Sequence, residues 1–272
     1  MRLATQDKPF FPDQFAEKLQ FVKSMGFAAF EVDGKVLIER FAEIKQAIRE
    51  TGVPVCTACG GYRGWIGDFD REKRRQAIAD ISEILKHVAE IAGQGIIVPA
   101  AWGMFSRRLP PLVPPRSEEE DRRILLDSLA QLNRTAQETG TYLYLEPLNR
   151  YEDHMLNKLS DAVSLIEEGN FSNVKVTADF FHMNIEEASV EASLRAAQQY
   201  IGHIHLADSH RYQPGDGHLD FVSGFKVLHE IGYAGYMAFE CRVLGEPAEE
   251  AYRKSVKYIQ SCLRQAGEEE RE

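Results

Sequence analysis

The feature that most constrains the fold of this 272-residue chain is a regular alternation of short β-rich runs with longer amphipathic stretches. The runs rich in branched and aromatic residues cover residues 2–6, 28–32, 53–59, 95–100, 142–147, 174–179, 203–207 and 236–241. Between them lie helix start and stop signals: Ser117 is placed to cap a helix that ends at Gly140, and Asp13 to cap one that ends at Gly26. Eight strand–helix units in a chain of this length predict a (β/α)8 barrel.

The alternative α/β architecture is a doubly wound open sheet. That fold usually carries a Gly-rich phosphate-binding turn after its first strand, and no such turn is present here. No linker divides the chain, so we expect a single α/β domain, a (β/α)8 TIM barrel over residues 1–272, with a short acidic tail at about 267–272. The Pro-rich segment LPPLVPPR (109–116) is expected to form a loop over the barrel mouth, as a lid or a wall.

Composition argues against several classes of function. The formal net charge is −10, which argues against a nucleic-acid surface because phosphate binding requires an excess of Lys and Arg. Four cysteines are too few for a disulfide scaffold, and Cys56 and Cys59 lie inside an apolar run without a second pair. We therefore interpret them as small core residues rather than as a redox or zinc motif. No apolar run is long enough to span a bilayer and the N-terminus has no signal region, so we expect a cytoplasmic protein without a membrane partner.

Side-chain alternation along the last four runs selects one candidate site. Apolar residues share one face of each run, and the other face ends at its carboxyl edge on Glu146, Asp179, His205 or Glu240. The separations of these four residues are 33, 26 and 35 positions, about one βα unit each. Because active sites of (β/α)8 barrels lie at the carboxyl edge, we expect the four side chains to converge.

Three carboxylates that converge without a cation would repel one another, so we expect a divalent ion among them. Three oxygen ligands and one imidazole suit Mn²⁺, Mg²⁺ or Co²⁺, and the lack of cysteine ligands disfavours a structural zinc. The alternative is that these residues are separate surface acids and a core histidine. That all four fall on the inward face, at the same end of their runs, argues against this alternative. Two further residues stay open: Glu31 can reach the mouth or serve as a cap or hydrogen-bonding group, and His203 fits a core histidine better than a ligand.

Four segments resemble those of the xylose-isomerase-like TIM-barrel superfamily, and most closely the ketose 3-epimerases of the D-tagatose and D-psicose (D-allulose) type. They are LEPLNRYE (145–152), DFFHMNIEE (179–187), GHIHLADSHRYQPGDGHLDF (202–221) and FECR (239–242). The resemblance implies a sugar isomerase or epimerase with one divalent metal ion, Mn²⁺ first, with Mg²⁺, Co²⁺ or Zn²⁺ as alternatives. The implied metal ligands are Glu146, Asp179, His205 and Glu240, the set that side-chain alternation also selects.

The resemblance also implies a reaction. Glu146 and Glu240 are implied as proton carriers on opposite faces of C3, so that a ketose or ketose phosphate is inverted there through a metal-stabilised enediolate. Family residues that bind the substrate fall on Glu152, His182 and Arg211. The implied partners are a small sugar substrate and further copies of the chain, as a dimer or tetramer.

Two aromatic residues are further candidate substrate contacts. Trp102, at the end of the fourth run, is a candidate stacking wall. Tyr62 lies in GGYRGW (60–65), where Arg63 and Trp65 also could wall a sugar or hold a phosphate; an ordinary loop is the alternative.

Other functions stay open for the same site. An aldose–ketose isomerase of the hydroxypyruvate isomerase type and a keto-inositol dehydratase would use the same metal ligands. A DNA-repair endonuclease of this superfamily would need several zinc ions, more strand-end histidines and a basic groove, which the acidic charge argues against. A non-catalytic sugar-binding barrel is disfavoured by the complete ligand set.

Overall fold

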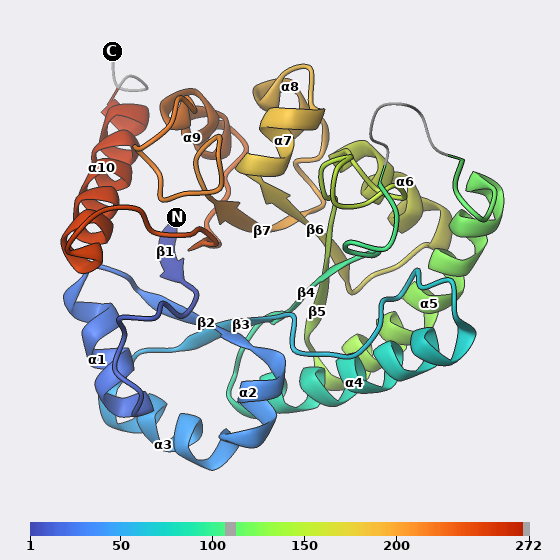
Figure 1. Ribbon diagram of the computed structural model, residues 1–272, viewed down its shortest axis with the longest axis horizontal. Coiled ribbons are helices and arrows are strands. Elements are labelled where there is room, and N and C mark those ends of the chain that lie inside the picture. The colour runs from blue at the N-terminus through green and yellow to red at the C-terminus, as the bar shows by residue number, and fades with distance from the viewer. Residues whose placement is uncertain (107–112, 269–272) are drawn as a thin grey trace.

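The computed structural model describes residues 1–106 and 113–268, and in this part of the chain eight parallel strands close into a barrel in sequence order (Figure 1). The strands are β1 (Arg2–Thr5), β2 (Ala29–Asp33), β3 (Val55–Cys59), β4 (Gly95–Pro99), β5 (Tyr142–Glu146), β6 (Val174–Asp179), β7 (Ile201–Leu206) and β8 (Tyr236–Phe239). The predicted (β/α)8 fold is therefore confirmed. The predicted strand boundaries differ from the observed ones by up to two residues.

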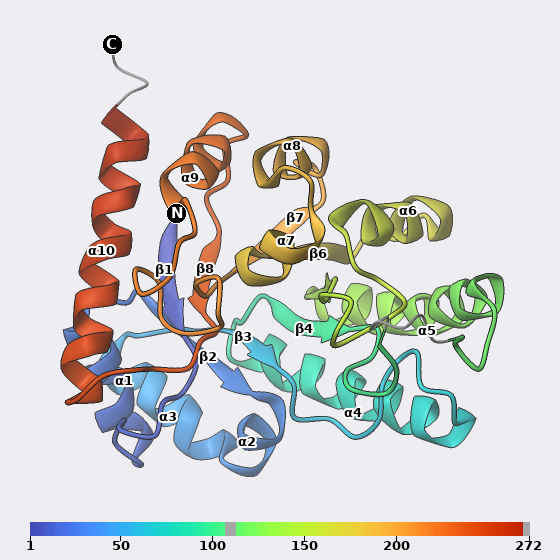
Figure 2. The ribbon, with the colours of Figure 1, turned by 45° about the horizontal axis from the view of Figure 1, so that its top comes forward.

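Helices surround the barrel on its outer side (Figures 1 and 2). They are α1 (Phe15–Ser24), α2 (Gly34–Glu39), α3 (Phe41–Thr51), α4 (Arg71–Glu90), α5 (Glu118–Thr139), α6 (Leu159–Gly169), α7 (Phe180–Glu186), α8 (Val190–Ala196), α9 (Phe221–Glu230) and α10 (Ala248–Glu268). Figure 2 shows the last helix, α10, beside α9 and next to β1. The first strand and the last helix therefore lie on the same side of the barrel.

The first and last strands close the barrel by pairing with each other. In the parallel β1–β8 pair, Leu3 is opposite Met237 and Thr5 is opposite Phe239. The Thr5 hydroxyl also makes a 2.6 Å hydrogen bond with the buried hydroxyl of Tyr252 on α10. These contacts place the carboxyl end of β1 directly beside that of β8.

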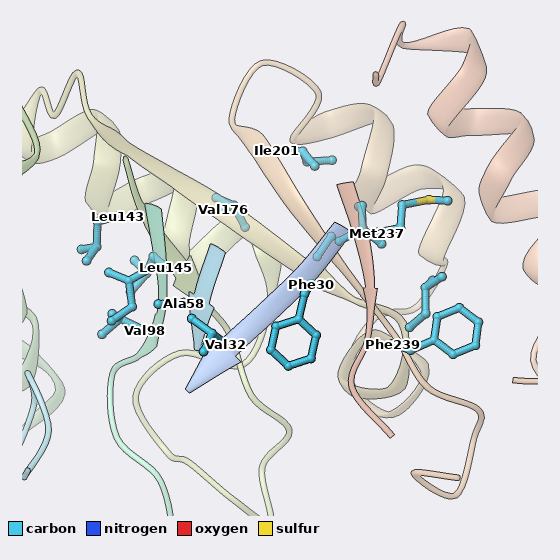
Figure 3. Close-up of a cluster of buried hydrophobic side chains, with 14 of the residues drawn as sticks. Phe30, Val32, Ala58, Val98, Leu143, Leu145, Val176, Ile201, Met237 and Phe239 are labelled. Atoms are coloured by element: carbon cyan, nitrogen blue, oxygen red, sulfur yellow. The ribbon is translucent and has the colours of Figure 1, made fainter. Parts of the chain in front are cut away.

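Alternation along the strands divides the core into two layers. Apolar side chains on the outer face, such as Leu143, Leu145 and Phe239, are fully buried, and Figure 3 shows them projecting from the strands together with those of neighbouring strands. They join one cluster with apolar residues of the surrounding helices. A small inner cluster fills part of the barrel interior with Ala4, Ala29, Cys56, Ala238 and Tyr236. The polar residues of the inner face are thereby left to the carboxyl edge.

One predicted helix cap is wrong. The first helix begins at Phe15, and the residue before it, Gln14, makes no side-chain capping bond. Asp13 instead accepts from the guanidinium of Arg40 at 3.3 Å, and Glu43 of α3 accepts from the Phe15 backbone N–H at 2.9 Å. A tertiary contact has taken over the capping role, which local sequence could not reveal. Ser117, by contrast, caps α5 as predicted, because its hydroxyl accepts from the Glu120 N–H.

Two sequence expectations fall partly outside the described residues. Of the Pro-rich segment 109–116, residues 109–112 lie outside, so its interpretation as a lid stays a prediction. Arg116, at its described end, is anchored by hydrogen bonds to the carbonyls of Gly67 and Asp68 and by an ion pair with Asp121. Of the expected tail, residues 267 and 268 belong to α10, and 269–272 lie outside the described part.

The cysteines are free. Cys56 is 2 % exposed in the inner cluster, in agreement with its interpretation as a core residue. Cys59 lies three residues further along β3 and faces Glu240, with its Sγ 3.9 Å from a carboxylate oxygen. The pair therefore forms no disulfide, and Cys59 borders the candidate site described next.

Candidate active site

Four side chains that can bind a metal converge at the carboxyl edge of the barrel. Glu146 and Asp179 are the last residues of β5 and β6. His205 is the last residue but one of β7, and Glu240 follows β8 directly, where its N–H continues the ladder to the Leu206 carbonyl. One ligand atom from each of the four lies within 4.8 Å of the others. We refer to them as the four-residue group.

His205 lies at the centre of the four-residue group. Its Nδ1 is 2.8 Å from a carboxylate oxygen of Glu146 and 2.9 Å from one of Glu240, while the nearest oxygen of Asp179 is 3.9 Å away. Arg211 adds a positive charge from the loop after β7. Its guanidinium donates to Asp179 at 2.7 Å and to Glu240 at 2.6 Å.

The environment moves the pKa values of the two glutamates in opposite directions. Burial and the nearby charge of Glu240 raise the pKa of Glu146 to about 7, against the opposing effect of His205. For Glu240, burial is outweighed by the positive charges of Arg211 and His205, which hold its pKa well below its ordinary value. Two carboxyl groups in one site with such different proton affinities suit the roles of acid and base.

The donor set fits a divalent ion. Three carboxylates and one imidazole, all but Glu240 almost fully buried, point their ligand atoms toward a common region. Bringing these carboxylates together without a cation is unfavourable, as the raised pKa of Glu146 shows. Oxygen ligands with one nitrogen suit Mn²⁺, Mg²⁺ and Co²⁺.

Glu31 supports His205 from the opposite side of its ring. The Glu31 carboxylate is 1 % exposed and lies 3.0 Å from His205 Nε2. It also accepts from Gln6 at 2.9 Å and from the Thr57 hydroxyl at 2.7 Å. Although burial opposes ionisation, the positive charges of His205 and His203 lower the pKa of Glu31 below its ordinary value. A carboxylate held in this way fixes the ring orientation of the histidine, so the open question about Glu31 is answered by a hydrogen-bonding role.

His203 lies one layer deeper, as expected. Its ring is fully buried, 5.1 Å from that of His205 between centroids. Its Nε2 is 2.9 Å from a Glu31 oxygen, but the contact is poorly aligned for a hydrogen bond. Glu31, His203 and His205 could also be considered a metal group on distance alone. Both Glu31 oxygens, however, already accept from Gln6, Thr57 and His205, so this set is better understood as support for the four-residue group.

His182 and Glu152 are connected through a residue that sequence reasoning missed, Asn149. The Asn149 backbone N–H donates to His182 Nδ1 at 3.1 Å, and its side-chain amide lies 2.9 Å from the same nitrogen. Because Nδ1 accepts the Asn149 backbone N–H, the proton of the neutral ring is on Nε2, 3.9 Å from Asp179, and burial lowers the pKa of the ring. The Asn149 amide also donates to Glu152 at 2.9 Å. This chain of contacts aims a hydrogen-bond donor of His182 toward the four-residue group.

The aromatic candidates line the side of the site formed by the loops after β3 and β4. The Trp102 indole N–H donates to Glu152 at 2.9 Å, and Trp102 is 55 % exposed. Trp65 packs edge-on against both Trp102 and Tyr62. The Tyr62 hydroxyl is buried and has no hydrogen-bond partner among the described residues. Arg63 pairs with Asp80 of α4, which favours the ordinary-loop alternative for this residue.

The loop after β7 is built to hold Arg211. Asp208 is buried and accepts backbone N–H groups of Ser209, Gly215 and Leu219, and these bonds lower its pKa against the effect of burial. Arg211 itself has a φ of 68°, a left-handed conformation that costs free energy for a residue with a side chain. Its carbonyl accepts the Arg242 N–H, which fixes the loop beside β8. His210 pairs with Asp216 and packs edge-on against Tyr212 within the same loop, which fits a loop residue rather than a member of the site.

Several residues of the site gave no sequence signal of their own. Asn149 lies inside the recognised LEPLNRYE segment, three residues after Glu146, and could have been found there. Gln6, Lys8 and Thr57 come from the first half of the chain, where no motif stood out. Lys8, 7 % exposed, lies three residues beyond β1 and is near Glu240.

The fold and the site together define a (β/α)8 barrel with three carboxylates and one histidine at its carboxyl edge that could hold a metal ion. The family model for the xylose isomerase-like TIM barrel matches residues 19–262. The 3-dehydro-D-guloside 4-epimerase of Escherichia coli (strain K12) is 49% identical over 262 residues, 96% of this chain and 100% of the relative. A D-psicose 3-epimerase of Enterocloster bolteae is 28% identical over 86% of this chain and 78% of its own length.

A solved structure gives the same result. The apo form of a 3-keto-D-glucoside 4-epimerase from E. coli superposes with a TM-score of 0.94 at 49% identity, covering 96% of this chain and 100% of that one. The chain belongs to the xylose isomerase-like TIM barrel family, and it is an enzyme of the sugar isomerase and epimerase type. Within the described residues, no helix combines the length and apolar character that a membrane crossing requires.

Proposed function

We propose that the chain is a divalent-metal-dependent sugar epimerase that inverts the carbon next to a ketone. The observation that carries this proposal is the pair of glutamates, Glu146 and Glu240, whose carboxylate oxygens lie in one group with His205 and Asp179 at the carboxyl edge of the barrel. A reaction that takes a proton from one face of a carbon and returns one to the other face needs two such groups. The proposal includes the four-residue group as the metal ligands. It also includes the candidate substrate contacts Glu152, His182, Arg211, Trp102 and Tyr62.

The proposed division of roles follows from the strand positions. Glu146 comes from β5 and Glu240 follows β8, with β6 and β7 between them, so the two carboxyl groups approach from different sides of the four-residue group. One glutamate removes the hydrogen beside the ketone as a proton, and the other delivers a proton to the opposite face. A divalent ion held there supplies electrostatic stabilisation of the negative charge that develops on the ketone oxygen.

His182 and Arg211 then act as hydrogen-bond donors. The His182 ring accepts from Asn149 at Nδ1 and therefore offers its Nε2–H to the ketone oxygen of the substrate. Arg211 places two guanidinium nitrogens against Asp179 and Glu240, at the border of the space that the substrate would occupy. Donors fixed in advance by other contacts stabilise developing charge at little cost in reorganisation.

For the substrate, we propose a 3-keto-D-glucoside-type sugar that is inverted at C4. The support is the solved 3-keto-D-glucoside 4-epimerase and the 3-dehydro-D-guloside 4-epimerase, each 49% identical over 96% of this chain. C4 is the neighbour of a C3 ketone, just as C3 is the neighbour of a C2 ketone, so the same two glutamates serve either reaction. Inversion of a ketose at C3 is the second candidate, supported by the relative that is a D-psicose 3-epimerase.

Mn²⁺ as the ion, a homo-oligomer and a cytoplasmic location complete the proposal. Each has a direct measurement: elemental analysis of the purified protein, its mass in solution and cell fractionation. The oxygen-rich donor set supports Mn²⁺, Mg²⁺ or Co²⁺ over a structural zinc.

The test is product analysis with metal-free and metal-loaded protein. Protein stripped with a chelator and shown by elemental analysis to be free of metal is assayed with methyl 3-keto-D-glucoside and with D-psicose, before and after addition of Mn²⁺, Mg²⁺, Co²⁺ or Zn²⁺. We expect no turnover without metal and a C4-inverted product from the glucoside with Mn²⁺. An aldose product would indicate an isomerase and loss of water a dehydratase. Full activity without metal, or no inversion of either sugar, would refute the proposal.

A further inference from the structure

Lys8 is a buried cation at the carboxyl edge that the proposed chemistry does not use. It lies three residues after β1 and is 7 % exposed. Because β1 pairs with β8, this position is next to Glu240, and the charges of Glu240, Cys241 and Arg211 all act on the Lys8 ammonium. Lys8 therefore lies on the β1–β8 side of the barrel mouth. Trp102 and Glu152 lie on the other side, in the loops that follow β4 and β5.

The ammonium of Lys8 has no ion-pair partner among the described residues. The adjacent acid, Asp7, forms an ion pair with Lys18 of α1 instead. No described carboxylate oxygen lies within 4.0 Å of Lys8 Nζ, and the nearest aromatic face, that of Tyr252, is 5.7 Å away. A lysine buried without a partner is costly, and burial lowers its pKa.

The segment that carries Lys8 is held firmly. The Lys8 carbonyl accepts the Phe11 N–H at 2.9 Å, which closes a turn. Phe10 packs edge-on against both Phe11 and Tyr252. Side chains alternate along the segment, since Gln6 reaches Glu31 in the site while Asp7 faces outward to Lys18. The Lys8 ammonium lies 5.7 Å from the centre of the Tyr252 ring, where the charges of Cys241 and Glu240 reach it, and the backbone of its segment is fixed by aromatic packing.

We propose that Lys8 binds the sugar substrate, donating a hydrogen bond from its ammonium to a hydroxyl oxygen on the β1–β8 side of the site. This inference rests on the proposed function, because it assigns a contact to the same substrate. It gives the unpaired cation a partner that only the bound state supplies. It also makes Lys8 a determinant of sugar specificity contributed by the first half of the chain.

The inference predicts an unusual pair of effects for Lys8→Met, which keeps the length of the stem but removes the charge. Removing an unpaired buried charge should leave the melting temperature unchanged or raise it. Losing a charged hydrogen bond to the sugar should raise KM for methyl 3-keto-D-glucoside by about 10- to 100-fold, with kcat within about threefold. Lys8→Arg, which retains the charge, should recover part of the loss in KM.

Lys18→Met is the matched control. Lys18 is equally buried but has its partner in Asp7, so its replacement should lower the melting temperature and leave KM unchanged. A wild-type KM for Lys8→Met, or a melting temperature lowered as in Lys18→Met with KM unchanged, would overturn the inference while leaving the epimerase intact. Lys8→Gln provides the same comparison if the methionine variant does not fold. A wild-type protein that inverts no sugar would overturn the proposed function itself, and with it this assignment.

Discussion

Strands β5 to β8 each lead to a member of the four-residue group, whereas strands β1 to β4 lead to Lys8, Glu31, Tyr62 and Trp102. The second set provides carboxylates and an imidazole whose ligand atoms lie within 4.8 Å of one another. The first half provides the Lys8 ammonium and the Tyr62 hydroxyl, which have no ion-pair or hydrogen-bond partner among the described residues, together with the bonded Glu31 carboxylate and Trp102 indole. We interpret the second half as the source of the reaction and the first half as the source of sugar selection.

The largest expected effect tests the second half. Glu146→Gln and Glu240→Gln keep the size and one ligand oxygen of each side chain but remove its proton transfer. Each should lower kcat by several orders of magnitude, since loss of a general base alone costs about 10²- to 10⁴-fold and a disturbed metal site adds to that. Steady-state assays with both sugars give the measurement. Glu138→Gln, an exposed glutamate of α5, is the matched control and should behave as wild type.

Glu31 comes from β2 in the first half but contacts His205 in the second half. Replacing it therefore tests whether the first half also supports metal binding. Glu31→Gln should weaken Mn²⁺ binding about 10- to 100-fold, as is typical when a residue that orients a metal ligand is replaced. Isothermal titration of the metal-free protein measures this directly. An unchanged affinity for Mn²⁺ would mean that barrel packing alone holds His205 and that Glu31 does not support metal binding.

The pH dependence of metal binding sharpens the account of the second half. In the metal-free protein the pKa of Glu146 is raised to about 7, so below that pH a proton must leave before the carboxylate can bind an ion. The Kd for Mn²⁺ should therefore be lowest above pH 7 and rise about tenfold per pH unit below it for each proton displaced. In Glu146→Gln, metal binding should release one proton fewer, so the Kd should change about tenfold less per pH unit. A Kd that does not change between pH 5.5 and 8 would contradict the assignment.

The smallest effect expected is in the aromatic side of the first half. Tyr62→Phe removes a buried hydroxyl that has no partner among the described residues, so stability should not fall. If that hydroxyl contacts the sugar, KM should rise several-fold and the ratio of activity on 3-keto-D-glucoside to that on D-psicose should change. Trp102→Phe, which loses the bond to Glu152, should act in the same direction. An equal loss of kcat on both sugars would contradict the proposal that the first half selects the sugar and the second half carries out the reaction.

Sequence reasoning recovered the two halves unequally, and the reason is physical. Glu146, Asp179 and His205 could be placed because strand alternation fixes which side chains face inward, and Glu240 continues that pattern one residue past β8. The contacts of Lys8 and Gln6 depend on the β1–β8 closure and on packing against Tyr252, which is 244 residues from Lys8 along the chain. The partners of Arg63 and Asp13 could not be predicted for a related reason: Asp80 and Arg40, which bind them, are near only in the folded chain.

The central claim is that Glu146 and Glu240 serve opposite faces of one carbon, and solvent exchange tests it most directly. Metal-loaded Glu240→Gln is incubated with methyl 3-keto-D-glucoside in D₂O, and the C4 position is followed by NMR, with wild type in parallel. In the wild type, deuterium should appear at C4 together with inversion. In Glu240→Gln the remaining base can remove and return a proton on one face only, so we predict deuterium at C4 with retained configuration. Inversion at a near wild-type rate in Glu240→Gln that binds metal normally would contradict the two-glutamate account.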